Sequence, residues 1–255
     1  MFEISFIDNP FERNFQAAVA AYIGKYPPIP FSGMKDGHYG DIYLNPDGNE
    51  KLINTPIARF LIFSLRAIVT CPFSTPHCRK YCYADKAETQ YQDCRETRER
   101  NVLASLRDDF AERMIELIEH YRKYDRKYNH GKGRTTIVRI HESGDFYSKK
   151  YYEKWVQIAR HFVCDPGIIF AAYTKSVEYV GDPVSNFTIR YSIWDDTEPE
   201  QIELARIKNL PTYTAARLTE EMIEELGPRH CRCADCATCQ KCYHGKVKDI
   251  VAEIH

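Results

Sequence analysis

Three cysteines, Cys71, Cys78 and Cys82, stand within twelve residues and are the first group in this sequence that could do chemistry. They follow an apolar run from Phe60 to Thr70 that is typical of a buried strand. The loop that leaves the carboxyl end of a strand is where α/β proteins build their sites. Such thiols can converge on a soft metal centre, and they would hold three corners of a 4Fe-4S cluster and leave the fourth iron open.

Two alternatives compete with an iron–sulfur centre at this loop. The thiols could hold a structural zinc ion, or they could be buried separately as small apolar side chains. Zinc sites favour two to four residues between paired ligands, whereas these cysteines are separated by six and then three residues. The spacing therefore favours iron–sulfur over zinc.

A second group of thiols lies near the C-terminus, where five cysteines fall between Cys231 and Cys242. The repeated Cys-x2-Cys spacing resembles a ferredoxin run, although four of these thiols would also suit zinc. The group could hold its own cluster, or one of its thiols could fill the corner left open at the first loop. The expected ligands are Cys233, Cys236, Cys239 and Cys242.

Polar side chains follow two further predicted strands. His141, Glu142 and Asp145 come directly after the strand 135–140, and Tyr173 and Lys175 follow the strand that begins at Ile168. Carboxyl ends of parallel strands meet at one edge of a sheet, so we expect these side chains to face the cysteine loop. Glu142 and Asp145 could then bind an amine and Lys175 a carboxylate.

The elements that must position these residues alternate between strand and helix patterns, which predicts right-handed βα units in an α/β fold, a parallel sheet curled into a partial barrel. We expect an N-terminal helix beginning at Pro10, a small hairpin joining 41–44 to 51–53, and one long amphipathic helix from about Asp85 to Gly131. The predicted parts are an N-terminal helix and hairpin at 1–58, the βα partial barrel at 59–228, and a cysteine-rich metal-binding tail at 229–255.

Composition limits the class of protein. The 255 residues carry a formal net charge of −1, which argues against a broad electrostatic grip on nucleic acid. No stretch is long and apolar enough for a membrane helix, and no secretion signal opens the chain. Ten cysteines in such a chain indicate metal ligation rather than disulfides, and we expect a cytoplasmic location.

The run Cys78-x3-Cys82-Tyr-Ala after a strand resembles the radical S-adenosylmethionine (radical SAM) superfamily. The resemblance implies a βα barrel, a 4Fe-4S cluster and S-adenosylmethionine as a further cofactor, with Tyr83 and Tyr173 as cofactor-binding residues. Asp85 stands where that family has its third cysteine, so Cys71 would substitute for that thiol from the other side of the loop.

A closer resemblance is to uncharacterised phage proteins of the gene-product-eighty-eight type. It covers roughly residues 70 to 242, with matching blocks at Cys71-Pro-Phe, at Cys82-Tyr-Ala, at 139–148, at 172–176 and in the C-terminal Cys-x2-Cys-x2-Cys. This resemblance implies a viral origin and a location in the host cytosol. It supplies no reaction.

The leading hypothesis is thus an iron–sulfur protein whose open iron binds a small molecule, with radical chemistry if S-adenosylmethionine binds. A second hypothesis is a zinc-stabilised nucleic-acid module built on the tail, whose flanks carry basic residues such as Arg229, Arg232 and Lys241. The third is electron transfer to a redox partner without catalysis.

Overall fold

The computed structural model describes residues 9–30, 33–128, 133–182, 184–231 and 236–254. Cys233 therefore lies outside the described residues, and for 126–128 only the backbone is described. Within the described ranges no helix is long and apolar enough to cross a membrane.

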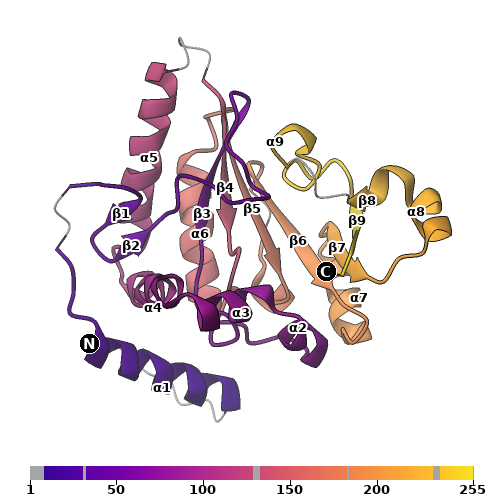
Figure 1. Ribbon diagram of the computed structural model, residues 1–255, viewed down its shortest axis with the longest axis horizontal. Coiled ribbons are helices and arrows are strands. Elements are labelled where there is room, and N and C mark those ends of the chain that lie inside the picture. Colours follow the sequence, from indigo (N-terminus) through magenta and orange to yellow (C-terminus); the bar gives the residue numbers. More distant parts are fainter. Residues whose placement is uncertain (1–8, 31–32, 129–132, 183, 232–235, 255) are drawn as a thin grey trace.

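A parallel sheet is the centre of the fold (Figure 1). In the described residues it has seven strands in the order β3-β4-β5-β6-β7-β9-β8, and every pairing is parallel. The strands are β3 (Ala58–Phe63), β4 (Thr135–Ile140), β5 (Ile168–Thr174), β6 (Phe187–Ile193), β7 (Thr212–Ala216), β9 (Asp249–Glu253) and β8 (His230–Cys231). Because β3 to β7 are neighbours in chain order, each crossover adds a strand at the same edge and the sheet curls into a half-barrel. The α/β class and the partial barrel are confirmed.

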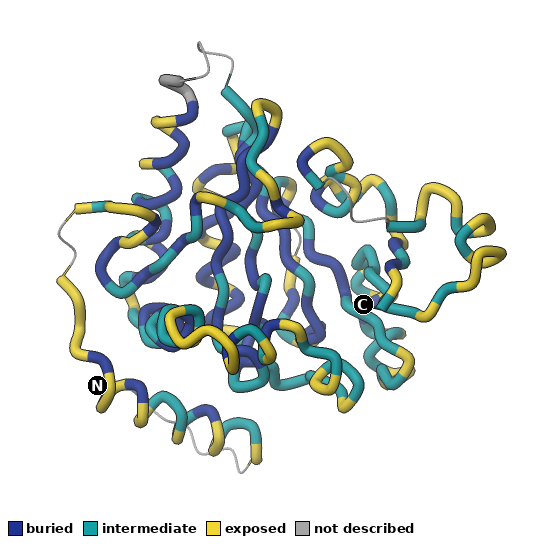
Figure 2. The backbone as a smooth tube through the Cα atoms, in the orientation of Figure 1, coloured by how far each residue is buried: buried dark blue, intermediate teal, exposed yellow. Residues whose placement is uncertain are grey.

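Two long helices cover the outer face of the sheet, α5 (Phe110–Tyr128) and α6 (Lys149–His161) (Figure 1). The strands turn Leu61, Val138 and Phe170 toward them, while Phe110 and Trp155 pack from the helices. All five side chains are fully buried. Figure 2 shows this layer as long dark-blue stretches along β3 to β6.

The C-terminal tail covers the other, inner face. There Phe60, Ile137 and Ala171 form a second apolar cluster with Ala237 and Tyr243 of the tail. Ala237 belongs to α9 (Cys236–Cys239), and β9 and β8 add two strands to the same sheet. The tail is thus integrated with the half-barrel rather than hanging from it.

The N-terminal segment packs beside the sheet. The helix predicted from Pro10 is α1 (Pro10–Lys25), and the side chain of Asn9 accepts the amide N–H of Phe11 at 2.9 Å, as an N-cap does. The hairpin differs from the expected one, since β1 (His38–Tyr39) pairs with β2 (Ile42–Tyr43) through the turn at Gly40. The segment 51–53 contributes only an isolated bridge between Ile53 and Gly48.

The long helix predicted from Asp85 is wrong as a single element. The structure has α3 (Tyr83–Gln90), α4 (Gln92–Leu106) and then α5. Tyr91 and Arg107 have extended backbones that break the chain between them. The buried face is not uniformly apolar, because α3 buries Glu88 and α4 buries Arg98 and Glu99 beside Val102 and Ala104.

The remaining short elements connect strands. They are α2 (Pro76–Lys80), η1 (Val177–Tyr179), α7 (Pro199–Ile207), α8 (Glu220–Leu226) and η2 (Gly227–Arg229). In Figure 1, α2 and α3 lie at the end of the sheet toward which the strands run. The cysteine loop is therefore at the carboxyl-end rim, as predicted.

Candidate metal centre

The cysteine loop is fastened to the sheet just after β3 ends. The amide of Leu65 donates to the carbonyl of Ser143, which lies in the loop after β4. Gly144 in that loop has a φ of +86°, and a Cβ there would stand 2.5 Å from Thr70 Oγ1. A glycine is needed at this position, because only a backbone without a side chain lets the two loops meet so closely.

The loop gives each of the three thiols a different backbone position. Cys71 follows the turn after Ile68, Cys78 lies within α2, and Cys82 is the N-cap residue of α3. Thr75 begins α2 by accepting the amide of Cys78 with its side chain at 3.3 Å. None of the three cysteines forms a disulfide.

The three thiols lie close enough to influence one another electrostatically. Desolvation raises the pKa of Cys71 well above its ordinary value, and the neighbouring Asp145, Cys78 and Cys82 raise it further. Desolvation likewise raises the pKa of Cys78 to about 11, although Lys175 opposes the shift. Gathered thiols in such surroundings resist ionisation unless a cation stabilises the thiolates.

The sulfur atoms of Cys71, Cys78 and Cys82 do not all lie within 4.8 Å of one another. Among the described residues, only His77, Asp195 and Asp196 bring three potential ligand atoms within 4.8 Å of one another. A mononuclear zinc site would need the three sulfur atoms of the loop to be closer together. A polynuclear cluster has a separate metal atom for each ligand, so it accepts thiols that are farther apart.

Asp145 is the buried carboxylate of the site. It is 6% exposed, and it accepts Thr174 Oγ1 at 2.6 Å and the amides of Phe146 and Lys175 at 2.7 and 2.8 Å. Desolvation raises the pKa of Asp145 to about 6 in spite of these hydrogen bonds. These contacts fix the loop after β4 to the loop after β5 beside Cys71.

Lys175 is also buried, with its ammonium group next to the thiols. Its Nζ donates to the carbonyl of Ser192 at 3.0 Å and to Thr197 Oγ1 at 3.2 Å. Desolvation lowers the pKa of Lys175, while the nearby Cys78, Asp145 and Asp196 act in the opposite direction. The structure therefore brings Asp145 and Lys175 together with the thiols.

Glu142 and Tyr83 meet at the edge of this site. The hydroxyl of Tyr83 donates to the carbonyl of Glu142 at 2.6 Å, and the carboxylate of Glu142 accepts from Asn49 Nδ2. Tyr83 is 60% exposed. The contact links α3 to the loop after β4 on the open side of the rim.

His141 points away from the thiols. It lies in the core on the helix side of the sheet, where its Nε2 is 2.9 Å from Tyr151 Oη and its ring packs on Phe146. Its φ is +61°, a left-handed conformation that turns the side chain away from the rim. Desolvation lowers the pKa of His141 well below its ordinary value.

The tail thiols form a separate group on the inner face. A hydrogen bond from Cys231 lowers the pKa of Cys242 to about 6, with Tyr173, Arg190 and Arg139 acting in the same direction. Tyr173 thus belongs to the tail group rather than to the cysteine loop. Cys236 is partly buried near Tyr243, whereas Cys239 is exposed.

The tail is held by a buried arginine that the sequence did not single out. Arg190 of β6 is 1% exposed, and its guanidinium donates five hydrogen bonds of 2.8–3.2 Å to backbone carbonyls. The acceptors are Lys241, Cys242, Val247 and Lys248 of the tail and Thr212 of β7. This one side chain fixes the segment that carries Cys242.

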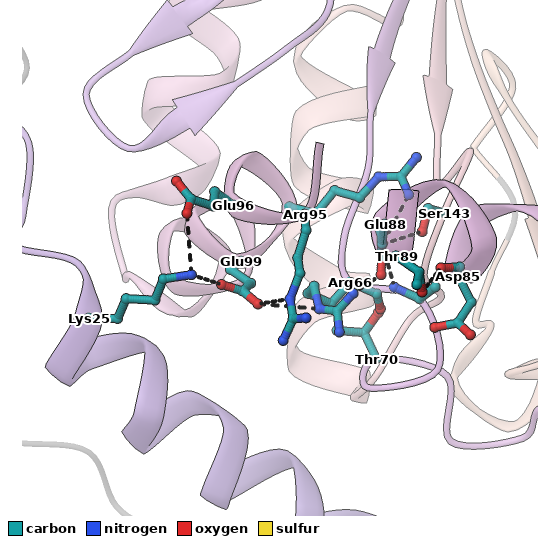
Figure 3. Close-up of polar contacts among 12 residues, drawn as sticks. Lys25, Arg66, Thr70, Asp85, Glu88, Thr89, Arg95, Glu96, Glu99 and Ser143 are labelled. Carbon is teal, nitrogen blue, oxygen red and sulfur yellow. Dashed lines mark hydrogen bonds and ion pairs between the residues drawn. The ribbon is translucent and has the colours of Figure 1, made fainter. Parts of the chain in front are cut away.

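A network of ion pairs joins the start of the cysteine loop to neighbouring helices (Figure 3). Glu88 accepts the amide of Ala67 and Nη1 of Arg98, both at 2.9 Å, and pairs with Arg66. Arg66 also forms an ion pair with Glu99, which is 1% exposed. The network joins α3, α4 and the start of the cysteine loop.

His77 attaches the same loop to the far side of the rim. Its Nδ1 is 2.6 Å from Asp195 Oδ1, and its amide donates to Asp196 Oδ2 at 2.7 Å. The two aspartates follow β6. Since His77 stands between Cys71 and Cys78, this contact sets where the loop lies over the sheet.

The site is thus a thiol-rich loop at the carboxyl-end rim of an α/β half-barrel, with a second thiol group under its inner face. The chain belongs to the family described as Gene product 88, which it matches over residues 43–245. No solved structure matches it.

Two curated relatives are similar over a shorter range. They are the Gene 88 proteins of Mycobacterium phage D29 and Mycobacterium phage L5, each 28% identical over 142 residues. Each match covers 54% of this chain, and it covers 55% of the D29 protein and 56% of the L5 protein. The chain therefore spans about half the length of the curated relatives it matches.

Proposed function

We propose that this protein is a viral iron–sulfur protein that binds a 4Fe-4S cluster through Cys71, Cys78 and Cys82. The observation that carries the proposal is the gathering of these three thiols at the rim, without disulfides and close enough to act electrostatically on one another. The phage origin of the relatives supports a viral protein working in the host cytosol.

The surroundings of the thiols fit such a cluster. Bringing desolvated thiolates together is unfavourable without metal, and iron removes that cost when it binds. Lys175 supplies a fixed positive charge beside Cys78, which would offset part of the negative charge of a thiolate-ligated cluster. The prolines and the His77 contact hold the loop in one conformation before metal arrives.

Three protein thiolates leave one iron without a protein ligand, and an open iron is a Lewis acid for a small molecule. Asp145 and Glu142 carry carboxylates at this rim and Lys175 an ammonium group, so the rim would suit a ligand with both an amine and a carboxylate. S-Adenosylmethionine has both groups and is the first ligand to test. The radical SAM resemblance enters the proposal only through this test.

The test is anaerobic reconstitution with iron and sulfide, followed by absorption and electron paramagnetic resonance spectroscopy of the reduced protein. We expect the signals of a reduced 4Fe-4S cluster, and a change in the resonance on adding S-adenosylmethionine if that ligand binds the open iron. Stoichiometric zinc with no iron-dependent signal would refute the proposal. A cluster signal that S-adenosylmethionine leaves unchanged would retain the cluster and reject this ligand.

The tail thiols support a second, separate metal centre. The contact between Cys231 and Cys242 and the partly buried Cys236 are arranged on the inner face, and the largest electrostatic influences on Cys242 come from that face rather than from the loop. Four thiols there would suit either zinc or a second cluster. Iron, sulfide and zinc contents of the reconstituted protein distinguish the two.

A further inference from the structure

Two arginines lie on the inner face of the sheet, and they differ in how their N–H groups are used. Arg190 of β6 has five guanidinium donors and five backbone acceptors, so none of its donors is left over. Among the residues that the structure describes, Arg139 of β4 makes one hydrogen bond, from Nη1 to the carbonyl of Ile140 at 3.2 Å. No carboxylate of the described residues lies within ion-pair distance of it.

Aromatic contacts fix the position of the Arg139 side chain. Its guanidinium carbon lies 4.0 Å from the centroid of the Tyr173 ring, and Tyr213 packs edge-on against that ring at 4.8 Å. Stacking fixes the plane of a guanidinium and leaves its edge, where the N–H donors are, free for another group. Arg139 is only partly buried, so this edge is within reach of a ligand.

Arg139 also lies between the two thiol groups. It acts electrostatically on Tyr83, which directly follows Cys82, and on Cys242 of the tail. Its strand pairs with β3, which leads into the cysteine loop, and with β5, which carries Tyr173. A group bound to Arg139 would therefore lie on the inner face, next to the rim.

We propose that Arg139 is an oxyanion-binding residue that holds the carboxylate or phosphate group of a small ligand between the cysteine loop and the tail. A planar guanidinium with free donors binds such groups through two parallel hydrogen bonds. The binding itself does not depend on the cluster; only the role of the ligand beside the cluster rests on the proposed function.

The experiment is isothermal titration calorimetry of the full chain with inorganic phosphate and, separately, with malonate. We expect one of the two to bind with a stoichiometry of about one, and Arg139→Gln to weaken that binding by at least about tenfold, as for a lost charge-assisted pair. Arg139→Lys keeps the positive charge but cannot donate two parallel hydrogen bonds, so we expect its affinity for the probe to be intermediate. Which probe binds separates a phosphate from a carboxylate ligand.

The control is Arg206→Gln, which removes the same charge from an arginine whose side chain is 82% exposed. It should bind the probe as the wild type does. Absence of binding by either probe, or equal weakening in both glutamine variants, would overturn the inference. Circular dichroism spectra and iron content of Arg139→Gln should match the wild type, so a failed anion site and a failed cluster give different results.

Discussion

At the scale of single residues, the structure separates polar side chains that the sequence placed together. His141, Glu142 and Asp145 all follow β4, yet only Asp145 lies beside the thiols, and Glu142 is at the open edge. The left-handed backbone of His141 sends its ring into the core. A strand end predicts where a residue is along the sheet, but the side to which it points depends on φ.

The buried His141 leads to a prediction about acid stability. Its pKa is lowered in the folded state by desolvation, so the unfolded chain takes up a proton near its ordinary pKa of 6.5 while the folded chain does not. The stability is therefore present above pH 6.5 and falls as the pH drops below it, by up to about 1.4 kcal/mol per pH unit. His141→Asn, which tolerates the positive φ, should reduce this slope.

Urea unfolding at pH 7.5 and pH 5.5 measures the effect. The wild type should lose about 1 kcal/mol more than His141→Asn between the two pH values. The raised pKa of Asp145 contributes with opposite sign, but it is common to both proteins and cancels in the comparison. Equal losses in the two proteins would show that His141 is protonated in the folded chain.

At the scale of elements, the position of the cysteine loop depends on contacts from helices distant in sequence. Glu88 of α3 accepts from Ala67 of the loop, from Arg98 of α4 and from Ser143 after β4. It is 3% exposed. No pattern in the sequence indicates that Glu88 holds the loop. The contact depends on the break at Tyr91, and the helical pattern of the sequence runs through that residue without marking it.

We expect Glu88→Gln to destabilise the protein by about 3 kcal/mol, because it leaves Arg66 and Arg98 without their shared buried carboxylate. Glu96→Gln is the control, since Glu96 reaches the same network only at its partly exposed edge, 3.5 Å from Lys25. Urea denaturation of both variants gives the comparison. Similar small losses would mean that the network does not hold the loop.

At the scale of the whole molecule, the sequence predicts the half-barrel well and the tail poorly. The strands β4 and β5 and the helix α1 begin where the sequence patterns place them. The tail strand β9 has five residues, and its partner β7 lies more than thirty residues earlier. Neither its pairing nor the contact between Cys231 and Cys242 has a local signal, because both depend on how the tail folds back.

Arg190 should be needed to keep the segment 241–248 closed against the sheet. Arg190→Lys removes most of five backbone hydrogen bonds and should make the segment 241–248 open more often. Limited trypsin digestion then cuts after Lys241, Lys246 or Lys248 at least about tenfold faster than in the wild type. Arg206→Lys, on the exposed side of α7, should digest at the wild-type rate. An unchanged rate in Arg190→Lys would contradict the role assigned to Arg190.

The central claim is that Cys71, Cys78 and Cys82 bind a 4Fe-4S cluster, and the most direct measurement is the iron and acid-labile sulfide content of anaerobically reconstituted variants. Replacing any one of the three by serine should remove about four iron and four sulfide per chain. Cys164→Ser, at an exposed thiol after α6, should remove none. Iron content that is the same in all four variants would contradict the account.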